Sequence, residues 1–246
     1  MAFSDRFLSA LNKWQKGWQE KACKRLEIAN ELESSIAETG LSQDFRNCDK
    51  TCYRKRFLVP NNPTNGGDLG PLFINGSLPE GVASWSSDKR FAQDFKDPTR
   101  EGTFAAIFSH IPDPSEVLLN IPALWEDSSF QTAVKRFHDG NRENADALFR
   151  MRSRQSEVIL RADLKYEELV HICGRSSPFD TLCELCGLHS EEEQDRLWSK
   201  FVEANSFPEE AFSLSTTATR AAMDRARASF LDKHGSTIQT VIAQRG

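Results

Sequence analysis

Three short segments in the middle of the chain carry side chains that could act on a charged, hydroxyl-rich substrate. The first runs from Cys52 to Leu58, where Arg54 is embedded among apolar residues with a strand-like pattern. An arginine on a buried strand is costly unless it meets an anion, and a phosphate suits the planar guanidinium group. The segment therefore indicates either a phosphate site or an edge strand whose basic residues face water.

The second segment places two serines around Trp85. Ser84 and Ser86 share one face if this stretch is a strand, because strand side chains alternate. Hydroxyl groups at the end of a strand can position a ribose or a carboxylate. The alternative is a serine-rich turn in which Ser87 or Asp88 caps the short helix that follows.

The third segment places a carboxylate at the start of an apolar run. Gln155 and Glu157 are two residues apart, so both side chains point the same way if they lie on a strand. Glu157 leads directly into Val158-Ile159-Leu160, and a dry flank strengthens the electrostatic effect of a carboxylate. The alternative is an exposed glutamate at the start of a strand.

The order and content of the three segments resemble the R-S-E class of mono-ADP-ribosyltransferases, the clostridial toxin-like enzymes with a Gln-x-Glu motif. The matches are Tyr53-Arg54, Ser84-Trp85-Ser86 and Gln155-Ser156-Glu157, and they span about residues 50 to 165. Trp85 stands where the class usually has threonine. The resemblance implies an α+β fold: an ADP-ribosyltransferase-like core of two packed, mainly antiparallel β-sheets with flanking helices and helical N- and C-terminal parts.

The resemblance also implies that side chains of the first two segments bind NAD+ as the substrate. The arginine would hold the phosphates and the nicotinamide ribose, and the first serine would orient the catalytic glutamate. The second serine would support the strand, and a phenylalanine would lie near the nicotinamide. These NAD+-binding residues are Arg54, Tyr53, Ser84, Ser86 and Phe91, with Phe95 as the alternative to Phe91.

By the same resemblance, Glu157, Gln155 and Ser84 carry catalysis. Cleavage of the nicotinamide–ribose bond builds positive charge on the ribose, as in glycoside hydrolysis, and Glu157 would stabilise that charge. The implied activity is an NAD+-dependent ADP-ribosyltransferase, a glycosyltransferase of the EC 2.4.2 type that releases nicotinamide. We expect no metal to take part.

The expected acceptor is a macromolecule that the residue at position 155 faces. Glutamine there resembles the exoenzymes that modify an asparagine of small GTPases, and also the pierisin-like enzymes that modify guanine. The amide of Gln155 can both donate and accept, which suits either group. The net charge of −5 favours a protein acceptor, whereas Arg150, Arg152 and Arg154 keep RNA or DNA as a close second, unless they form a solvated strand face.

Two other functions compete with the transferase. A non-catalytic, partner-binding module on a degenerate transferase fold is the principal alternative. A zinc-binding module would rest on ligand types alone, and we expect instead that cysteines on the short helix predicted from Asp180 to Gly187 are small buried apolar groups. The residues concerned are Cys173, Cys183, Cys186 and His189.

Composition predicts a globular protein of the cytoplasm. The chain has 246 residues, 31 Lys plus Arg and 36 Asp plus Glu, which suits one large domain or two small ones. We find no secretory signal and no apolar run near the roughly 18 residues of a membrane span. The six cysteines are read as reduced thiols. The class implies a toxin, for example of a toxin–antitoxin or phage-defence system, that is bacterial or phage-related or is delivered into the cytosol of a target cell.

The elements around these segments divide the chain into an N-terminal helical segment (1–45), the catalytic core (46–165) and a C-terminal helical region (166–246). An apolar stripe from Phe7 to Ile36 predicts one or two helices that pack on the core or dock a partner. Residues 166–210 hold 11 acidic and 3 basic residues. The stripe and this acidic part are the expected surfaces for an antitoxin or chaperone.

The predicted elements follow from apolar periodicity, turn residues and caps. In the core we expect strands at 51–59, 81–85, 103–108, 116–121 and 156–160, a loop at 61–70, and a helix over 128–150 that is interrupted near Gly140. In the C-terminal region we expect a capping box at Ser190, a short helix at Pro208 and a helix from Thr216 that ends at Gly235.

Overall fold

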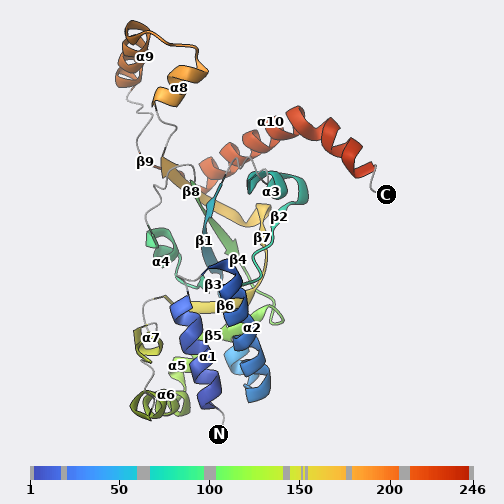
Figure 1. The fold of residues 1–246 in the computed structure, drawn as a ribbon, viewed down its shortest axis with the longest axis vertical. Helices are drawn as coiled ribbons and strands as arrows, with labels where there is room; N and C mark the ends of the chain where they lie inside the picture. Colours follow the sequence, from blue (N-terminus) through green and yellow to red (C-terminus); the bar gives the residue numbers. More distant parts are fainter. Residues whose placement is uncertain are drawn as a thin grey trace. The chain divides into compact units, whose positions relative to one another are not determined.

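The computed structural model describes residues 3–17, 21–59, 67–96, 104–140, 145–150, 152, 155–175, 179–204 and 211–243. These residues form an α+β protein with one large, mainly antiparallel sheet, a two-stranded sheet and about ten helices (Figure 1). The chain folds into two compact units. Unit 1 comprises Met1–Arg54, Pro79–Asp94 and Ser109–Leu164; unit 2 comprises Lys55–Leu78, Phe95–Phe108 and Lys165–Gly246.

Hydrogen bonds join seven of the described strands in the order β5-β6-β3-β1-β4-β8-β9, and β2 pairs with β7 in the small sheet. Where the register between two strands is defined, the pairing is antiparallel. The strands are β1 (Cys52–Leu58), β2 (Ser77–Leu78), β3 (Val82–Ser86), β4 (Phe104–His110), β5 (Val117–Asn120), β6 (Glu157–Arg161), β7 (Leu164–Lys165), β8 (Leu169–Arg175) and β9 (Ala211–Ser213). The α+β class is confirmed. The packing of two sheets on each other stays a prediction, as does the three-part division of the chain.

Unit 1 contains most of the helices of the N-terminal half. Helices α1 (Asp5–Lys16) and α2 (Ala22–Thr39) run side by side (Figure 1). The Ser4 hydroxyl caps α1 by accepting from Phe7 N at 3.2 Å, and α2 ends where Gly40 adopts a φ of 61°. Both ends agree with the sequence prediction. The remaining helices of unit 1 are η2 (Gln43–Arg46), α4 (Lys89–Asp94), α5 (Ile121–Glu126), α6 (Ser128–Gly140) and α7 (Asp146–Arg150).

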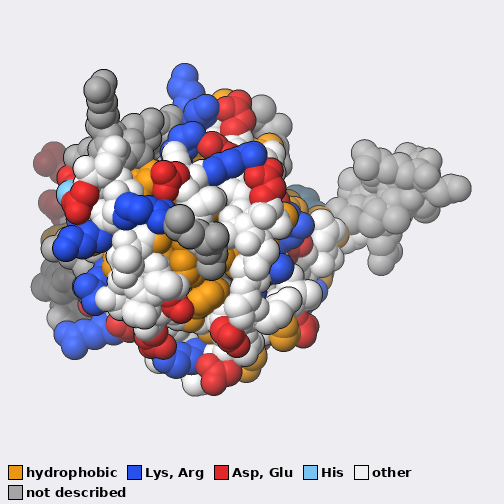
Figure 2. Space-filling model, turned by 90° about the horizontal axis from the view of Figure 1, so that it is seen from below, with side chains coloured by type: hydrophobic (Ala, Val, Ile, Leu, Met, Phe, Trp, Pro, Cys, Tyr) orange, Lys and Arg blue, Asp and Glu red, His pale blue; other side chains and the backbone are white. Residues whose placement is uncertain are grey.

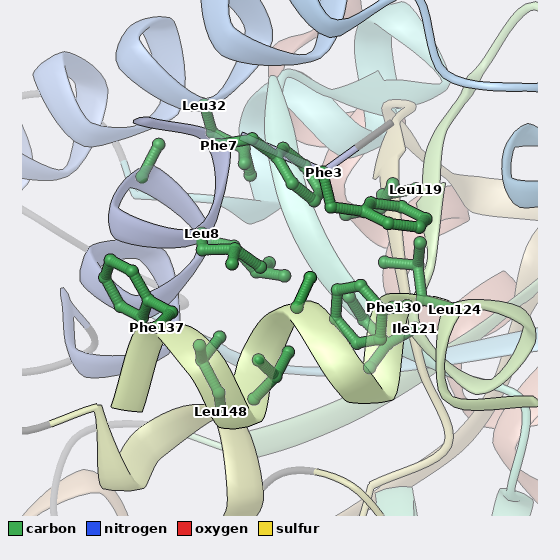
Figure 3. Close-up of a cluster of buried hydrophobic side chains, with 14 of the residues drawn as sticks. Phe3, Phe7, Leu8, Leu32, Leu119, Ile121, Leu124, Phe130, Phe137 and Leu148 are labelled. Atoms are coloured by element: carbon green, nitrogen blue, oxygen red, sulfur yellow. The ribbon is translucent and has the colours of Figure 1, made fainter. Parts of the chain in front are cut away.

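The core of unit 1 is built on the apolar face of α1. Phe7 and Leu8 lie against side chains of α6 and β5, among them Phe130 and Leu119, and all four are fully buried (Figure 3). Burial of each such side chain contributes about 1.5–3 kcal/mol, so α1 is an integral part of the unit. The apolar stripe is therefore core, as the first of its two interpretations predicted. Leu26 departs from the stripe with 64% exposure, and Trp18 lies outside the described residues.

Unit 2 contains α3 (Leu69–Asn75), η3 (Tyr166–Glu168), α8 (Phe179–Leu185), α9 (Glu191–Glu203) and α10 (Thr216–Ala243). Thr219 of α10 is fully buried, and its hydroxyl accepts from the backbone N–H of Ile172 in β8 at 3.1 Å. The capping box at the start of α9 is confirmed, because Ser190 and Glu193 each bond to the other's backbone N–H.

Several predictions for this region were wrong. Helix α10 continues through Gly235, since one helical glycine costs only about 1 kcal/mol. The predicted loop at 61–70 runs into α3 at Leu69. The mostly helical region after residue 165 contains β8 and β9, because the β-branched residues of β8 were outweighed by the surrounding acidic and helix-forming residues. The helix at Pro208 lies outside the described residues.

Candidate functional site

The register of three neighbouring strands in unit 1 aligns the predicted motif residues. Ser86 of β3 stands opposite Glu157 of β6, and Tyr53 of β1 stands opposite Ser86. Ser84 stands opposite Ile159, which makes it a diagonal neighbour of Glu157. Diagonal neighbours across an antiparallel pair are close enough for side chains to bond. The sheet therefore brings together residues that are far apart in the sequence.

Glu157 is buried and accepts hydrogen bonds from three side chains. The exposed fraction of the residue is 3%. Glu157 Oε1 accepts from the Ser84 hydroxyl and from Trp14 Nε1 at 3.1 Å, and Oε2 accepts from Gln15 Nε2 at 3.4 Å. A buried carboxylate is costly unless it is bonded in this way, so the three donors offset its loss of hydration.

Arg54 finds its anion within the chain. Its Nε donates to Glu80 Oε1 at 2.8 Å, and its Nη2 donates to the same oxygen. The Glu80 side chain is 6% exposed and that of Arg54 is 24% exposed. The expectation that an inward arginine meets an anion is met within the chain, because the Glu80 carboxylate supplies negative charge.

Arg54 also fixes the position of Ser84. Its Nη1 donates to the backbone carbonyl of Ser84 at 2.7 Å, while the hydroxyl of the same serine donates to Glu157. Arginine, serine and glutamate are thus connected in one chain of hydrogen bonds within unit 1. The predicted role of Arg54 in binding the NAD+ phosphates stays a prediction.

Gln155 does not lie on the strand of Glu157. Strand β6 begins at Glu157, and Ser156 adopts a left-handed backbone with a φ of 43°. The side-chain alternation that was expected to align Gln155 with Glu157 is therefore wrong, because it requires an extended residue between them. The backbone of Gln155 is held instead, since its carbonyl accepts from the Ser86 hydroxyl at 2.5 Å. Its role toward an acceptor stays a prediction.

The short helix after β3 forms as expected. Asp88 Oδ1 accepts from the backbone N–H of Arg90 at 2.9 Å and of Phe91 at 3.2 Å, which caps α4. Phe91 is half-buried on α4, and Phe95 follows the helix with 38% exposure. The predicted contact of either ring with nicotinamide is not tested by this geometry.

Of the three arginines before the glutamate, the two that the structure describes do not lie on a strand. Arg150 is the last residue of α7, and the guanidinium of Arg152 stacks on the ring of Trp125 at 5.1 Å from its centroid. Arg154 lies outside the described residues. The alternative of a solvated strand face is therefore wrong for Arg150, because this residue ends a helix, and the guidance of a nucleic acid stays a prediction.

The site includes three residues that the sequence did not single out: Trp14, Gln15 and Glu80. Trp14 was assigned only to the apolar stripe of the N-terminal segment, and its indole N–H gave no separate signal. Its partner Glu157 lies 143 positions further along the chain. Only the packing of α1 against the sheet reveals this contact.

Two thiols lie where β1 begins. Cys48 Sγ is 3.7 Å from Cys52 Sγ, and both residues are buried. The hydrogen bond between the two sulfurs lowers the pKa of Cys48 to about 6. The same contact, together with burial, raises the pKa of Cys52. The pair therefore favours one shared proton near neutral pH.

The residues of the alternative zinc site, which was not the favoured interpretation, do not cluster within the described part of the chain. Within the described ranges, no three His, Cys, Asp or Glu side chains form a group that could hold a metal ion. Cys183 is buried and Cys186 is exposed, so the two cysteines of the motif have different surroundings. Gly187 ends the segment in a left-handed conformation, as predicted, although α8 starts one residue before the expected cap at Asp180.

Among the described helices, none is long and apolar enough to cross a lipid bilayer.

Comparisons of the chain with models of protein families, with curated proteins and with solved structures gave no match. Any functional conclusion therefore rests on the chemistry and geometry of the chain's own residues.

Proposed function

We propose that this protein is a mono-ADP-ribosyltransferase that cleaves NAD+ and transfers ADP-ribose to a macromolecular acceptor. One observation carries the proposal: the Ser84 hydroxyl donates to the buried carboxylate of Glu157, while Arg54 binds the Ser84 carbonyl. The three side chain types that the R-S-E resemblance names thus meet in one bonded group. They come from three strands and from positions as far as 103 residues apart, since Arg54 and Glu157 are the end members.

The chemistry requires a fixed carboxylate beside the ribose. The bond between the nicotinamide nitrogen and the ribose carbon breaks, and its electron pair leaves with nicotinamide as a neutral molecule. Positive charge then develops on the ribose ring, where a pre-positioned carboxylate stabilises it. The acceptor nucleophile forms the new bond to the same carbon and loses a proton. Glu157 supplies the carboxylate, and Ser84 holds it in place.

We favour a protein acceptor over a nucleic acid. A nucleic-acid surface needs a field of basic side chains, whereas Figure 2 shows basic and acidic side chains interspersed on the face that it displays. In unit 1 several basic residues pair with acidic ones, such as Lys13 Nζ with Glu31 Oε1 at 2.7 Å. Arg152 is engaged with Trp125. A protein with an amide acceptor side chain suits the neutral Gln155.

The first test is the release of nicotinamide from NAD+ and the transfer of labelled ADP-ribose in a cell lysate. We expect wild-type protein to do both and Glu157→Gln to lose at least 100-fold of each rate, since removal of one transition-state charge contact commonly costs that much. Glu192→Gln on α9 is the matched control and is expected to stay active, because this glutamate is exposed.

Product analysis identifies the acceptor. Label that survives nuclease and is lost with protease indicates a protein acceptor, and the reverse indicates RNA or DNA. A fully active Glu157→Gln variant would overturn the proposal.

A second candidate function is a non-catalytic module that binds a partner protein. It is favoured by the burial of Glu157 and by the charge neutralisation of Arg54 by Glu80. Both features would also be expected if these residues formed a purely structural hydrogen-bond network that binds no substrate. Wild-type protein that binds no NAD+ and releases no nicotinamide would favour this function.

A further inference from the structure

Helix α1 brings two donors to the carboxylate of Glu157. Trp14 Nε1 lies 3.1 Å from Oε1, and Gln15 Nε2 lies 3.4 Å from Oε2. These adjacent residues lie at the end of a helix in a part of the chain that the resemblance does not reach. The carboxylate is therefore held from two sides, by β3 through Ser84 and by α1.

The hydrogen bonds differ between the two carboxylate oxygens. Each carboxylate oxygen offers two lone pairs. Oε1 uses both, for Ser84 and Trp14, whereas Oε2 accepts only from Gln15 among the described residues. Oε2 therefore keeps one lone pair with which to accept a further donor. A substrate hydroxyl that bonds to Glu157 without displacing a protein donor must bond to Oε2.

The two donors lie on a helix that is held rigidly by its packing in the core. Leu8 and Leu11 of the same helix are at most 1% exposed, and Trp14 packs against the same apolar core. Gln15 is 6% exposed, and its side-chain oxygen has no hydrogen-bond partner. A buried acceptor without a partner is unfavourable, and such groups are often found at functional sites. The amide is thus kept with its nitrogen toward Glu157 although its oxygen gains no bond.

We propose that Trp14 and Gln15 are positioning residues of the transferase site, which fix Glu157 so that Oε2 faces the substrate. This inference rests on the proposed function. Trp14 completes the hydrogen bonding of Oε1 and Gln15 sets the direction of Oε2. Neither residue needs to touch NAD+. Their loss should therefore slow the chemical step and leave the binding of NAD+ unchanged.

The kinetic test uses Trp14→Phe and Gln15→Met, which remove the donors and keep most of the side-chain volume. We expect kcat for nicotinamide release to fall about 10- to 100-fold in each variant, the effect of one hydrogen bond to a charged group. KM for NAD+ should stay within about twofold, because only the transition state is affected. Trp198→Phe on α9 is the matched control, since Trp198 is 39% exposed, and should change neither constant. Unchanged kcat in both variants would overturn the proposal.

A second measurement tests the contact without any activity. The indole N–H resonance of Trp14, assigned by its loss in Trp14→Phe, should shift in Glu157→Ala while that of Trp198 stays in place. An unshifted Trp14 resonance would overturn the positioning role, even if the enzyme is active. Wild-type protein that shows the shift but releases no nicotinamide would overturn the proposed function and leave only the contact. The two failures are therefore distinguishable.

Discussion

The guanidinium of Arg54 binds the backbone of Ser84, the serine whose hydroxyl donates to Glu157. Arg54 holds the carbonyl of Ser84, and Glu80 holds the other end of the guanidinium. The position of the serine therefore depends on an ion pair that is itself largely buried. This arrangement gives Arg54 a structural role that is separate from any role toward a substrate.

The two roles of Arg54 can be separated by stability measurements. Arg54→Ala removes the guanidinium that pairs with the buried Glu80 carboxylate, and we expect the free energy of unfolding to fall by about 2–4 kcal/mol. Arg54→Ala combined with Glu80→Gln also removes the glutamate charge and should restore part of that loss. Urea denaturation of the single and double variants measures both effects.

An additive loss in the double variant would contradict a direct Arg54–Glu80 interaction. If the double variant regains stability but still fails to bind NAD+, the arginine has a separate role toward the substrate. Measurement of Glu80→Gln alone completes the double-mutant cycle, together with the wild type, Arg54→Ala and the double variant.

Prediction of individual residues from the sequence succeeded where the residues belong to recognisable motifs. Ser84 and Glu157 could be proposed as partners because the side-chain types and their order matched a known pattern. Glu80 could not be proposed as the partner of Arg54, because a glutamate beside Gly81 looks like an ordinary turn residue. Gln155 was misplaced because nothing in the sequence indicates the left-handed backbone at Ser156.

At the scale of elements, strand β1 begins at a pair of coupled thiols. Because the Cys52 contact lowers the pKa of Cys48 to about 6, its thiolate forms in the folded protein below the pH at which a free thiol ionises. The folded pKa is lower than the unfolded one. The stabilisation it gives is therefore full above about pH 9 and is lost as the pH falls toward 6.

We predict that Cys52→Ala moves the titration of Cys48 to higher pH. The variant removes the sulfur that bonds to the thiolate, which is the largest cause of the lowered pKa. Ultraviolet thiolate absorbance as a function of pH measures the change, and Cys48→Ala identifies the signal. A wild-type protein without a thiolate signal between pH 6 and 8 would contradict the predicted coupling.

Elements were predictable where apolar periodicity and caps agreed. The strands β1, β3, β4, β5 and β6 all lie within one or two residues of the predicted segments. Helix α10 was cut short in the prediction because Gly235 was taken as a stop, although the helix continues through it. Strand β8 was missed because it follows an acidic, helix-rich pattern and is stabilised by pairing with β4, a contact between distant parts of the sequence.

At the scale of the whole molecule, each unit is held together by contacts between distant segments. In unit 2, the hydroxyl of Tyr166 donates to Asp224 on α10 at 2.6 Å. Arg220 on the same helix donates to the carbonyls of Tyr166, Glu167 and Leu169. These bonds fasten α10 to the segment that precedes β8.

The tyrosine in this contact offers a pH-dependent test of the fold. Burial, with a further contribution from Asp224, raises the pKa of Tyr166 to about 12. The folded pKa exceeds the unfolded value of about 10, so the stability linked to the buried, neutral hydroxyl is complete below pH 10 and is lost as the pH rises toward 12. In Tyr53→Phe, where Tyr166 is the one tyrosine left of two, phenolate absorbance should have its midpoint near pH 12.

The same titration in denaturant should have its midpoint near pH 10. Asp224→Asn should lower the folded midpoint, because the carboxylate is one cause of the raised pKa. A folded midpoint at the denatured value would show that the Tyr166 hydroxyl is exposed, and would contradict the docking of α10 seen here.

The hydrogen bonds from α1 to Glu157 of β6 have a consequence for synthesis on the ribosome. Trp14 and Gln15 leave the ribosome early, but Glu157 is added more than 140 residues later. At about 5–20 residues per second, this interval lasts roughly 7 to 28 seconds. Until then the apolar face of α1 lacks its partner on β6, and the nascent chain lacks the carboxylate of the proposed transferase site. Under the proposed function, transferase activity would therefore begin only after strand β6 has been translated.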